Sequence, residues 1–206
     1  MARVSGPLMS MEASGTIAST LVYSRWKGIP YVRRHAIPSN PRAAKQIAVR
    51  AALRYFSRTW KTALGAPQWL EWQTQADTMH MSGFNRFIAV NLQRVNHMIA
   101  PIQTVIPIAP GTTPVAPTVT GTGGIGCATL DWVYTGVAPD WGTIIFGALG
   151  GAPTPGPDCI IGFTEASTLH FVHTPIATGT WHYILRGFLA QTVWGPDSTD
   201  ETAIVT

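Results

Sequence analysis

Residues 180–188 have the sequence TWHYILRGF, a run rich in aromatic and β-branched side chains. Runs of this kind, bounded by Gly, Pro, Asn, Asp or Ser, are typical of β-strands. Six similar runs lie in the same half of the chain: Val115–Thr120, Ala128–Tyr134, Thr143–Leu149, Cys159–Phe163, Thr168–His173 and Ala203–Thr206. About seven short strands within roughly 90 residues predict an antiparallel β-sandwich for this half.

The charge of the chain changes sign between its two halves. Residues 101–206 hold one Lys or Arg and 7 Asp or Glu, a net charge of −6. Residues 1–100 hold 13 Lys or Arg and 3 Asp or Glu, a net charge of +10, so the formal total of +4 hides two opposite units. This asymmetry excludes one uniformly mixed surface. Only 12% of the residues are charged, roughly half the usual fraction, which hints at a surface covered by neighbours.

A β-hairpin is expected near the start of the basic half. Residues Thr16–Tyr23 and Ile29–Arg34 are rich in β-branched and aromatic side chains, and Arg25–Gly28 between them has the composition of a turn. Two such runs joined by a short turn predict two paired antiparallel strands.

About three helices should follow the hairpin. Asn40 followed by Pro41 is a strong helix start, with Asn40 as the N-cap. This helix can extend to about Leu64, where Gly and Pro follow. A short helix is expected around residues 69–72. A third should start near Ser82, where the next residue, a glycine, either leaves room for close approach or marks the turn.

Prolines separate the two halves. Residues 99–117 contain five prolines, which favour a stiff, extended spacer. The chain is therefore predicted to have a basic α+β anchoring domain over residues 1–98, a proline-rich linker over 99–114 and an all-β sandwich over 115–206. The same prolines interrupt the uncharged stretch between Arg94 and Asp131, so no membrane-spanning helix is expected.

Compartment and thiol state are linked expectations. Residues 1–7 lack the apolar core of a signal peptide, which predicts synthesis and retention in a cytoplasm. Cys127 and Cys159 both lie in the acidic half. A buried reduced pair is expected for them, with a disulfide as the alternative, because cytoplasmic thiols normally stay reduced.

The sequence offers no pattern typical of a catalytic, cofactor or metal site. The glycine-rich run at residues 122–126 precedes a strand rather than a helix, so it lacks the context of a phosphate-binding loop. His170 and His173 are three residues apart on an expected strand, which places them on opposite faces. We therefore expect no enzyme, no cofactor and no metal.

A basic surface is the sharpest candidate site. One face of the expected long helix is apolar and comprises Val49, Ala52, Leu53, Phe56, Trp60 and Ala63. A narrow basic stripe on its other face comprises Arg50, Arg54, Arg58 and Lys61. The hairpin adds Arg25, Lys27, Arg33 and Arg34. These eight residues are predicted to dock on an acidic protein surface, with nucleic-acid phosphates and a simple solvated face as the alternatives. Arginine outnumbers lysine 11 to 3, which favours fixed, multi-contact pairing.

Tryptophans divide into two groups. Core packing is expected for Trp26, Trp60, Trp69 and Trp72. Trp141 and Trp194 are expected at loop edges of the sandwich, where a sugar or cell-surface contact is the alternative to packing.

The acidic half resembles fibronectin type III domains. The residues that carry the resemblance are Leu130-Asp131-Trp132 on an early strand, the aromatic strand at 181–188, and Trp194-Gly195-Pro196 as a turn before the last strand. The resemblance covers about residues 112–206 and implies an immunoglobulin/fibronectin III-like sandwich. It says nothing of the ligand, because this fold hosts many functions.

The basic half is similar to the N-terminal part of uncharacterised structural proteins of tailed bacteriophages. The matching residues are Tyr23 to Gly28, Tyr31-Val32-Arg33, Asn40-Pro41, Gln46, Arg50, Trp72 and Ser82 to Ile88. This similarity covers about residues 5–95 and implies a virion component, synthesised in the host cytoplasm, that often carries an appended immunoglobulin-like module.

The function expected from these observations is that of a non-enzymatic virion structural protein. A capsid decoration or accessory role is favoured, with the basic domain docked on other virion proteins of the capsid or tail shell, in several copies or as a homo-oligomer. A neck, tail or baseplate component is the first alternative. A nucleic-acid-binding protein and a carbohydrate or host-surface binding module are the others.

Overall fold

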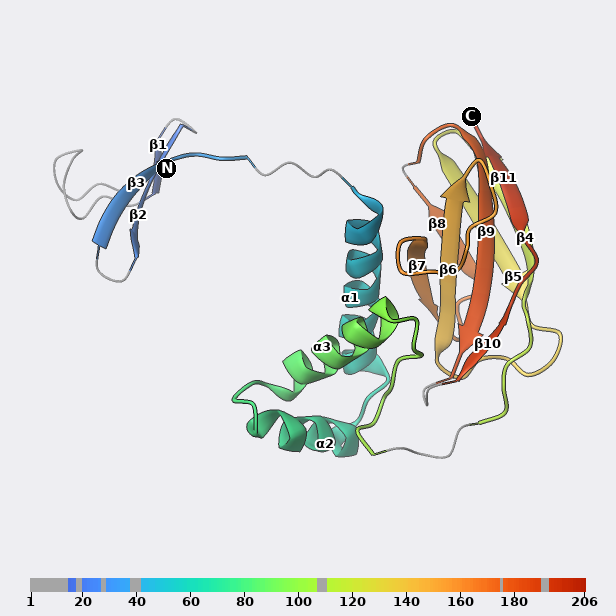
Figure 1. The fold of residues 1–206 in the computed structure, drawn as a ribbon, viewed down its shortest axis with the longest axis horizontal. Coiled ribbons are helices and arrows are strands. Elements are labelled where there is room, and N and C mark those ends of the chain that lie inside the picture. The colour runs from blue at the N-terminus through green and yellow to red at the C-terminus, as the bar shows by residue number, and fades with distance from the viewer. Residues whose placement is uncertain are drawn as a thin grey trace. The chain divides into compact units, whose positions relative to one another are not determined.

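The computed structural model describes residues 15–17, 20–26, 29–37, 42–106, 111–174, 176–189 and 193–206. The chain divides into two compact units, Met1–Pro41 and Arg42–Thr206. Each unit is considered by itself below, and Figure 1 gives the labels of the elements. None of the helices in the described ranges is long and apolar enough to cross a membrane.

The first unit contains a three-stranded antiparallel sheet. Its strands are β1 (Gly15–Ile17), β2 (Leu21–Trp26) and β3 (Ile29–Arg34), in that order. The pairing of β2 with β3 confirms the expected hairpin. The first strand, expected to be continuous, is split, because the N–H of Thr20 donates to the oxygen of Ile17 over 2.9 Å and turns β1 back onto β2. Lys27 and Gly28 of the expected turn lie outside the described residues.

Three helices open the second unit. They are α1 (Ala44–Thr62), α2 (Ala66–Asp77) and α3 (Gly83–Asn96). Their number agrees with the sequence-based prediction, but α1 begins at Ala44, and the expected cap at Asn40–Pro41 lies outside the described residues. Ser82 caps α3 as expected, because its Oγ accepts a hydrogen bond from the N–H of Asn85 over 3.3 Å.

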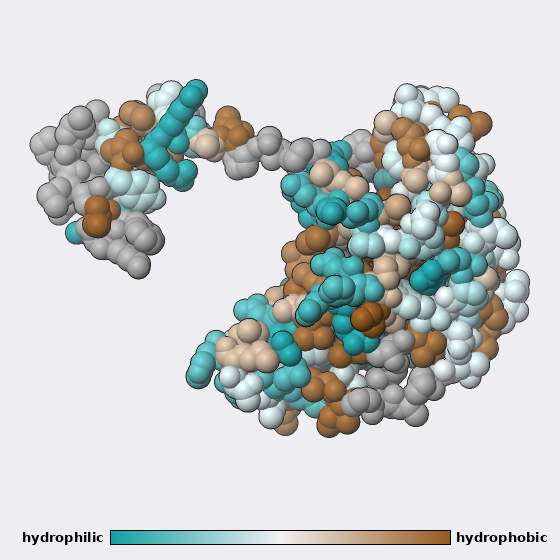
Figure 2. All heavy atoms as spheres, viewed as in Figure 1, coloured by the Kyte–Doolittle hydropathy of each residue, from teal (hydrophilic) through white to brown (hydrophobic). Residues whose placement is uncertain are grey.

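The buried face of α1 is rotated from the predicted one. Its buried residues are Ala48, Ala52, Tyr55, Phe56 and Thr59. Val49 and Leu53, predicted to be buried, are 41% and 42% exposed. The rotation follows from the neighbours of α1, since the helix packs against both α3 and strand β7 (Ile160–Glu165), which draws Tyr55 and Thr59 inward. Figure 2 shows apolar atoms on the visible surface of this helical part.

The rest of the second unit is two antiparallel sheets. One sheet has the order β4 (Thr118–Gly124), β5 (Cys127–Val133), β8 (His170–His173). The other has the order β10 (Trp194–Asp197), β9 (Gly179–Phe188), β6 (Gly142–Leu149), β7, with β11 (Glu201–Val205) also paired to β9. All seven β-rich runs found in the sequence therefore contribute strands, and the expected turn at Trp194-Gly195-Pro196 is instead part of an eighth, β10.

A first core lies between the two sheets. Leu130 and Trp132 of one sheet meet Ile145, Tyr183 and Leu185 of the other, and all five are at most 5% exposed. The outer face of the larger sheet carries a second core, which it shares with the helices. Strand β6 serves both cores, because neighbouring residues of a strand point to opposite faces. This explains its continuous apolar run, in which Ile144 and Phe146 contact the helical core.

The boundary between the compact units differs from the one predicted. The sequence-based division places a linker at residues 99–114, whereas the helices and the sandwich belong to one unit that starts at Arg42. The chain after α3 packs back onto the helices: Ala100 is fully buried, and the indole N–H of Trp72 donates to the oxygen of Gln103 over 2.7 Å. The charge distribution and the prolines carry no information about which elements share a core. For this reason they predicted a domain boundary at a different place.

The two cysteines are unpaired thiols. Cys127 begins β5 and Cys159 precedes β7, so they lie on different sheets, and both are half-buried. The expected burial of the two thiols is therefore only partial.

Candidate functional site

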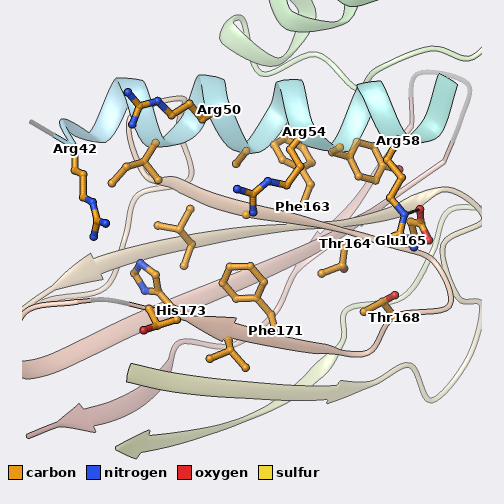
Figure 3. A pocket seen from close by; sticks show the side chains of 17 residues that line it. Arg42, Arg50, Arg54, Arg58, Phe163, Thr164, Glu165, Thr168, Phe171 and His173 are labelled. Atoms are coloured by element: carbon orange, nitrogen blue, oxygen red, sulfur yellow. Dashed lines mark ion pairs between the residues drawn. The ribbon is translucent and has the colours of Figure 1, made fainter. Parts of the chain in front are cut away.

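A groove runs beside the basic stripe of α1. Its cavity has a volume of about 440 Å³ and lies between α1 and the strands β7 and β8 (Figure 3). Arg50, Arg54 and Arg58 line it at successive helical turns, together with Arg42, which precedes the helix. The stripe predicted from helical spacing therefore forms one wall of a concave site in the same unit.

The opposite wall comes from two strands that end their sheets. β7 is the last strand of the larger sheet and β8 is the last strand of the smaller one. The wall and floor residues they contribute include Ile161, Gly162, Phe163, Thr164, Glu165, Phe171, Val172 and His173. The groove thus combines a basic helical wall with a mostly apolar strand wall.

One ion pair closes the groove at its Glu165 end. The Nε of Arg58 lies 2.7 Å from Oε1 of Glu165, and this pair joins α1 to β7. The Arg58 side chain is 67% exposed, so solvent screens the pair and its contribution to stability is small. Its main effect is to fix the position of Arg58 beside the strand.

Tyr55 holds the helix wall in place. Its hydroxyl donates a hydrogen bond to the backbone oxygen of Trp141 over 2.9 Å, and its ring stacks on Phe163 with centroids 5.4 Å apart. Burial raises the pKa of the Tyr55 hydroxyl far above its ordinary value, so this group stays neutral and remains a donor. The basic stripe is therefore carried by a helix that is anchored to the sheet.

His173 adds no charge to the groove at neutral pH. Burial lowers the pKa of its imidazole from 6.5 to about 4. Its Nδ1 lies 3.3 Å from the hydroxyl oxygen of Tyr183. The electrostatic character of the groove therefore depends on four arginines and one carboxylate, Glu165.

The eight predicted docking residues are divided between the two compact units. Arg50, Arg54 and Arg58 line the groove, and Lys61 is exposed near the end of α1, outside it. Arg25, Arg33 and Arg34 are exposed on β2 and β3 of the first unit, and Lys27 lies outside the described residues. Arg42 was missed in the prediction. Its spacing from Arg50 is eight residues, two further steps along the i, i+4 row, which could have indicated it.

The histidines behave as strand spacing predicts. His170 is exposed and its Nδ1 lies 2.8 Å from Oδ1 of Asp131, whereas His173 is half-buried on the other face of β8. In the part of the chain that the structure describes, no group of three or more His, Cys, Asp or Glu side chains gathers as metal ligands would.

The tryptophan predictions are partly corrected. Trp72 is buried as expected, but Trp69, predicted to be core, is 41% exposed. Trp141, expected at a loop edge, is only 4% exposed because it packs on Tyr55 and Phe188. The indole N–H of Trp194 donates to the oxygen of Met98 over 3.0 Å. The half-buried ring of Trp194 also has the guanidinium carbon of Arg186 5.6 Å from its centroid, so it is engaged within the protein. The Trp26 side chain lies outside the described residues.

Comparisons with known proteins found similar solved structures only. No protein-family model and no curated protein matches it. Solved structures that resemble part of it include a Fn3-like protein from Clostridium thermocellum, with 20% identity over 46% of this chain and 96% of that one and a TM-score of 0.34. The FN1-FN3 domains of chicken CNTN1 share 18% identity over 47% of this chain and 34% of that one, with a TM-score of 0.35.

A third similar structure is a beta-1,2-glucanase from Parabacteroides distasonis. It shares 11% identity over 47% of this chain, which covers only 14% of that enzyme, with a TM-score of 0.38. The class of protein is therefore defined by this chain's own strands and helices: an α+β protein with three helices and several antiparallel sheets, of which two pack as a β-sandwich.

Proposed function

We propose that this protein is a non-enzymatic structural component of a tailed-bacteriophage particle, with capsid decoration or an accessory role as its task. The observation that carries the proposal is the basic groove, in which Arg50, Arg54 and Arg58 stand on a helix that shares a core with the sandwich. The similarity of residues 5–95 to phage structural proteins supports the setting, and the low charged fraction of 12% suits a surface covered by neighbours.

The mechanism of this function is docking. Guanidinium groups pair with carboxylates through parallel N–H donors, which gives both energy and orientation. Because Tyr55 and Phe56 fix α1 against the sheet, the helix that carries the arginines is already ordered and binding costs only the freedom of their side chains. Residues 101–206 carry a net charge of −6, which opposes contact between an acidic surface and the rest of the sandwich and so restricts docking to the groove, one wall of which β7 and β8 supply.

We propose further that the sandwich is fibronectin III-like. Its smaller sheet pairs the first, second and fifth of its eight strands, and the larger one pairs the third, fourth, sixth, seventh and eighth, with the chain crossing between sheets after β5, β7 and β8. This distribution is that of immunoglobulin-like Greek-key sandwiches. In this role the sandwich is a display module whose loops face the medium.

Particle composition tests the proposed function. We expect this chain in purified virions of the phage that encodes it, at a constant ratio to the major capsid protein by quantitative mass spectrometry, and at the shell exterior in a particle reconstruction. If the chain lies at the neck, tail or baseplate, the capsid-decoration role is wrong but the protein is still a structural component of the particle. Absence from particles at any stoichiometric level would overturn both.

Nucleic-acid binding is the second candidate, and the arginine-lined groove is the observation that favours it. It predicts that affinity for DNA falls steeply with salt and that this dependence is reduced when Arg50, Arg54 and Arg58 are neutralised. Affinity that is weak and unchanged by these substitutions would remove this candidate.

A further inference from the structure

We infer that the groove between α1 and the strands β7 and β8 binds an extended acidic peptide segment of a partner protein, with carboxylates at alternate positions. This inference names the ligand of the proposed docking site. It rests on the proposed function only for the assembly in which the partner occurs. The argument follows from spacing, from the edges of the two sheets and from charge.

The spacing of the arginines matches the spacing of a strand. Arg50, Arg54 and Arg58 are four residues apart on α1, which separates them by about 6 Å along the helix axis and about 12 Å in total. In an extended peptide, every second side chain points the same way, at intervals of about 6.6 Å. Three carboxylates at alternate positions therefore span about 13 Å and fall opposite the three guanidinium groups.

The strand wall offers the main chain of a peptide its own partners. Among the strands that the structure describes, β7 and β8 end their sheets, so alternate backbone N–H and C=O groups on their outer sides are not used in pairing with those strands. An extended segment that enters the groove can hydrogen-bond to such an edge, which is a recurrent mode of peptide recognition. Exposed Val172 beside half-buried Phe171 supplies apolar contact for side chains that point away from the arginines.

The charge of the groove favours an acidic occupant. Four arginines line it against one carboxylate, and that carboxylate, Glu165, is already within 2.7 Å of Arg58. The neutral state of His173 leaves this balance unchanged at pH 7. Carboxylates of the ligand then meet guanidinium groups whose fork geometry suits them.

The aromatic rings of the groove disfavour a single-stranded nucleic acid. Such ligands are held by bases stacked on open aromatic faces. Phe163 is stacked on Tyr55 and meets the edge of Phe188, and Phe171 lies directly against Gly162. Both rings are therefore engaged within the protein, whereas a peptide needs no stacking platform.

Two synthetic peptides of equal composition test the inference on the full chain. In the first, three glutamates alternate with threonines; in the second, the three glutamates are contiguous and the threonines flank them. We expect the alternating peptide to bind at least about tenfold more tightly, as measured by calorimetry at low salt. Equal affinity of the two peptides would overturn the strand geometry, and tighter binding of an oligothymidylate would assign the groove to nucleic acid instead.

A pair of charge-matched variants locates the site. Arg50→Glu with Arg54→Glu should weaken the alternating peptide by about tenfold or more, whereas Arg33→Glu with Arg34→Glu changes the net charge equally and should bind like the native chain. Equal losses in both variants would mean diffuse attraction and would overturn the groove as the site. Circular dichroism checks that each variant folds, and the peptide comparison on the native chain stands if one does not. Neither result depends on whether virions contain the protein.

Discussion

Tyr55 joins α1 to the sandwich through both its ring and its hydroxyl. The ring stacks on Phe163 and meets the edge of Phe188, and the hydroxyl donates to the oxygen of Trp141. The Trp141 oxygen also accepts the N–H of Ala166 over 3.2 Å, so the hydroxyl of Tyr55 is one of two donors to it. The hydroxyl therefore contributes about as much as an ordinary buried hydrogen bond.

Tyr55→Phe should lower the free energy of unfolding by about 0.5–1.5 kcal/mol, because one buried hydrogen bond is lost while the ring packing stays and the Trp141 carbonyl keeps the N–H of Ala166 as a donor. Urea denaturation followed by tryptophan fluorescence measures this. Tyr31→Phe is the matched control, since Tyr31 is 40% exposed on β3, and it should leave the transition unchanged. A Tyr55→Phe transition that coincides with the native one would contradict the role of this bond.

His173 makes stability depend on pH. Burial lowers the pKa of its imidazole to about 4, whereas the unfolded chain binds a proton with the ordinary pKa of 6.5. Between these values the unfolded state holds more protons, so stability is complete above pH 6.5 and declines as the pH falls toward 4. Since the ring is only half-buried, we expect a loss on the order of 2 kcal/mol over this range.

The test compares free energies of unfolding at about pH 7 and about pH 4.5. His173→Gln should show a smaller decrease than the native chain, because it removes the group that the unfolded state protonates. His80→Gln is the control, since His80 is exposed after α2, and it should keep the native slope. If His173→Gln and the native chain lose stability in parallel, His173 is not the responsible group.

At the scale of elements, Gly83 sets how closely α2 and α3 approach. A Cβ at this position would lie 2.8 Å from the backbone nitrogen of Gln73 and 3.1 Å from its Cα. The N–H of Gly83 donates a hydrogen bond to Oε1 of Gln73 over 2.9 Å, which also joins the start of α3 to α2. Of the two roles considered from the sequence, close approach is the one this geometry supports.

Gly83→Ala should therefore destabilise the protein by about 1–3 kcal/mol, because the two backbones must separate. This outcome opposes helix propensity, which favours alanine by about 1 kcal/mol. Asn85→Ala is the control, at an exposed position in the same first turn, and should be neutral or slightly stabilising. The thermal midpoint of each variant measures the effect, and a higher midpoint for Gly83→Ala would mean that packing does not limit this site.

Local patterns in the sequence located most elements. The β-rich runs, the Ser82 cap and the basic row at Arg50, Arg54 and Arg58 are short-range features that depend on neighbouring residues. Which face of a helix or strand is buried depends on elements that are far away in the sequence. Exposed Val49 and buried Trp141 were therefore misplaced, since nothing nearby in the sequence reports that α1 packs on β7.

The groove, too, could be predicted only in part from local sequence patterns. The arginine row was visible in the sequence, but its opposite wall at Phe163 and Phe171 comes from strands about a hundred residues further on. Only the packing of α1 on the larger sheet brings the two walls together. A helix stripe with three open interpretations thus became one wall of a defined cavity.

At the scale of the whole molecule, the second unit depends on a sheet that is covered on both faces. The outer face of the larger sheet buries Ile144, Phe146 and Phe188 completely, in one core with Phe56 of α1. Exposing such a side chain costs about 1.5–3 kcal/mol, so loss of the helices removes up to about 9 kcal/mol. A domain of this size is stable by only about 5–15 kcal/mol in total.

The sequence-based boundary implies that segment 115–206 folds on its own. We expect instead that the isolated segment does not fold stably. We expect it to aggregate or to bind a hydrophobic dye strongly, whereas segment 42–206, which keeps the helices, should unfold in one cooperative transition. Segment 42–206 is also the control for truncation, because it lacks only the first compact unit. A monomeric segment 115–206 with the same free energy of unfolding as segment 42–206 would mean that the helical core is a contact between independent domains. In that case the arginine groove would open and close with the joint, and its affinity for the alternating peptide would fall in proportion to the open fraction.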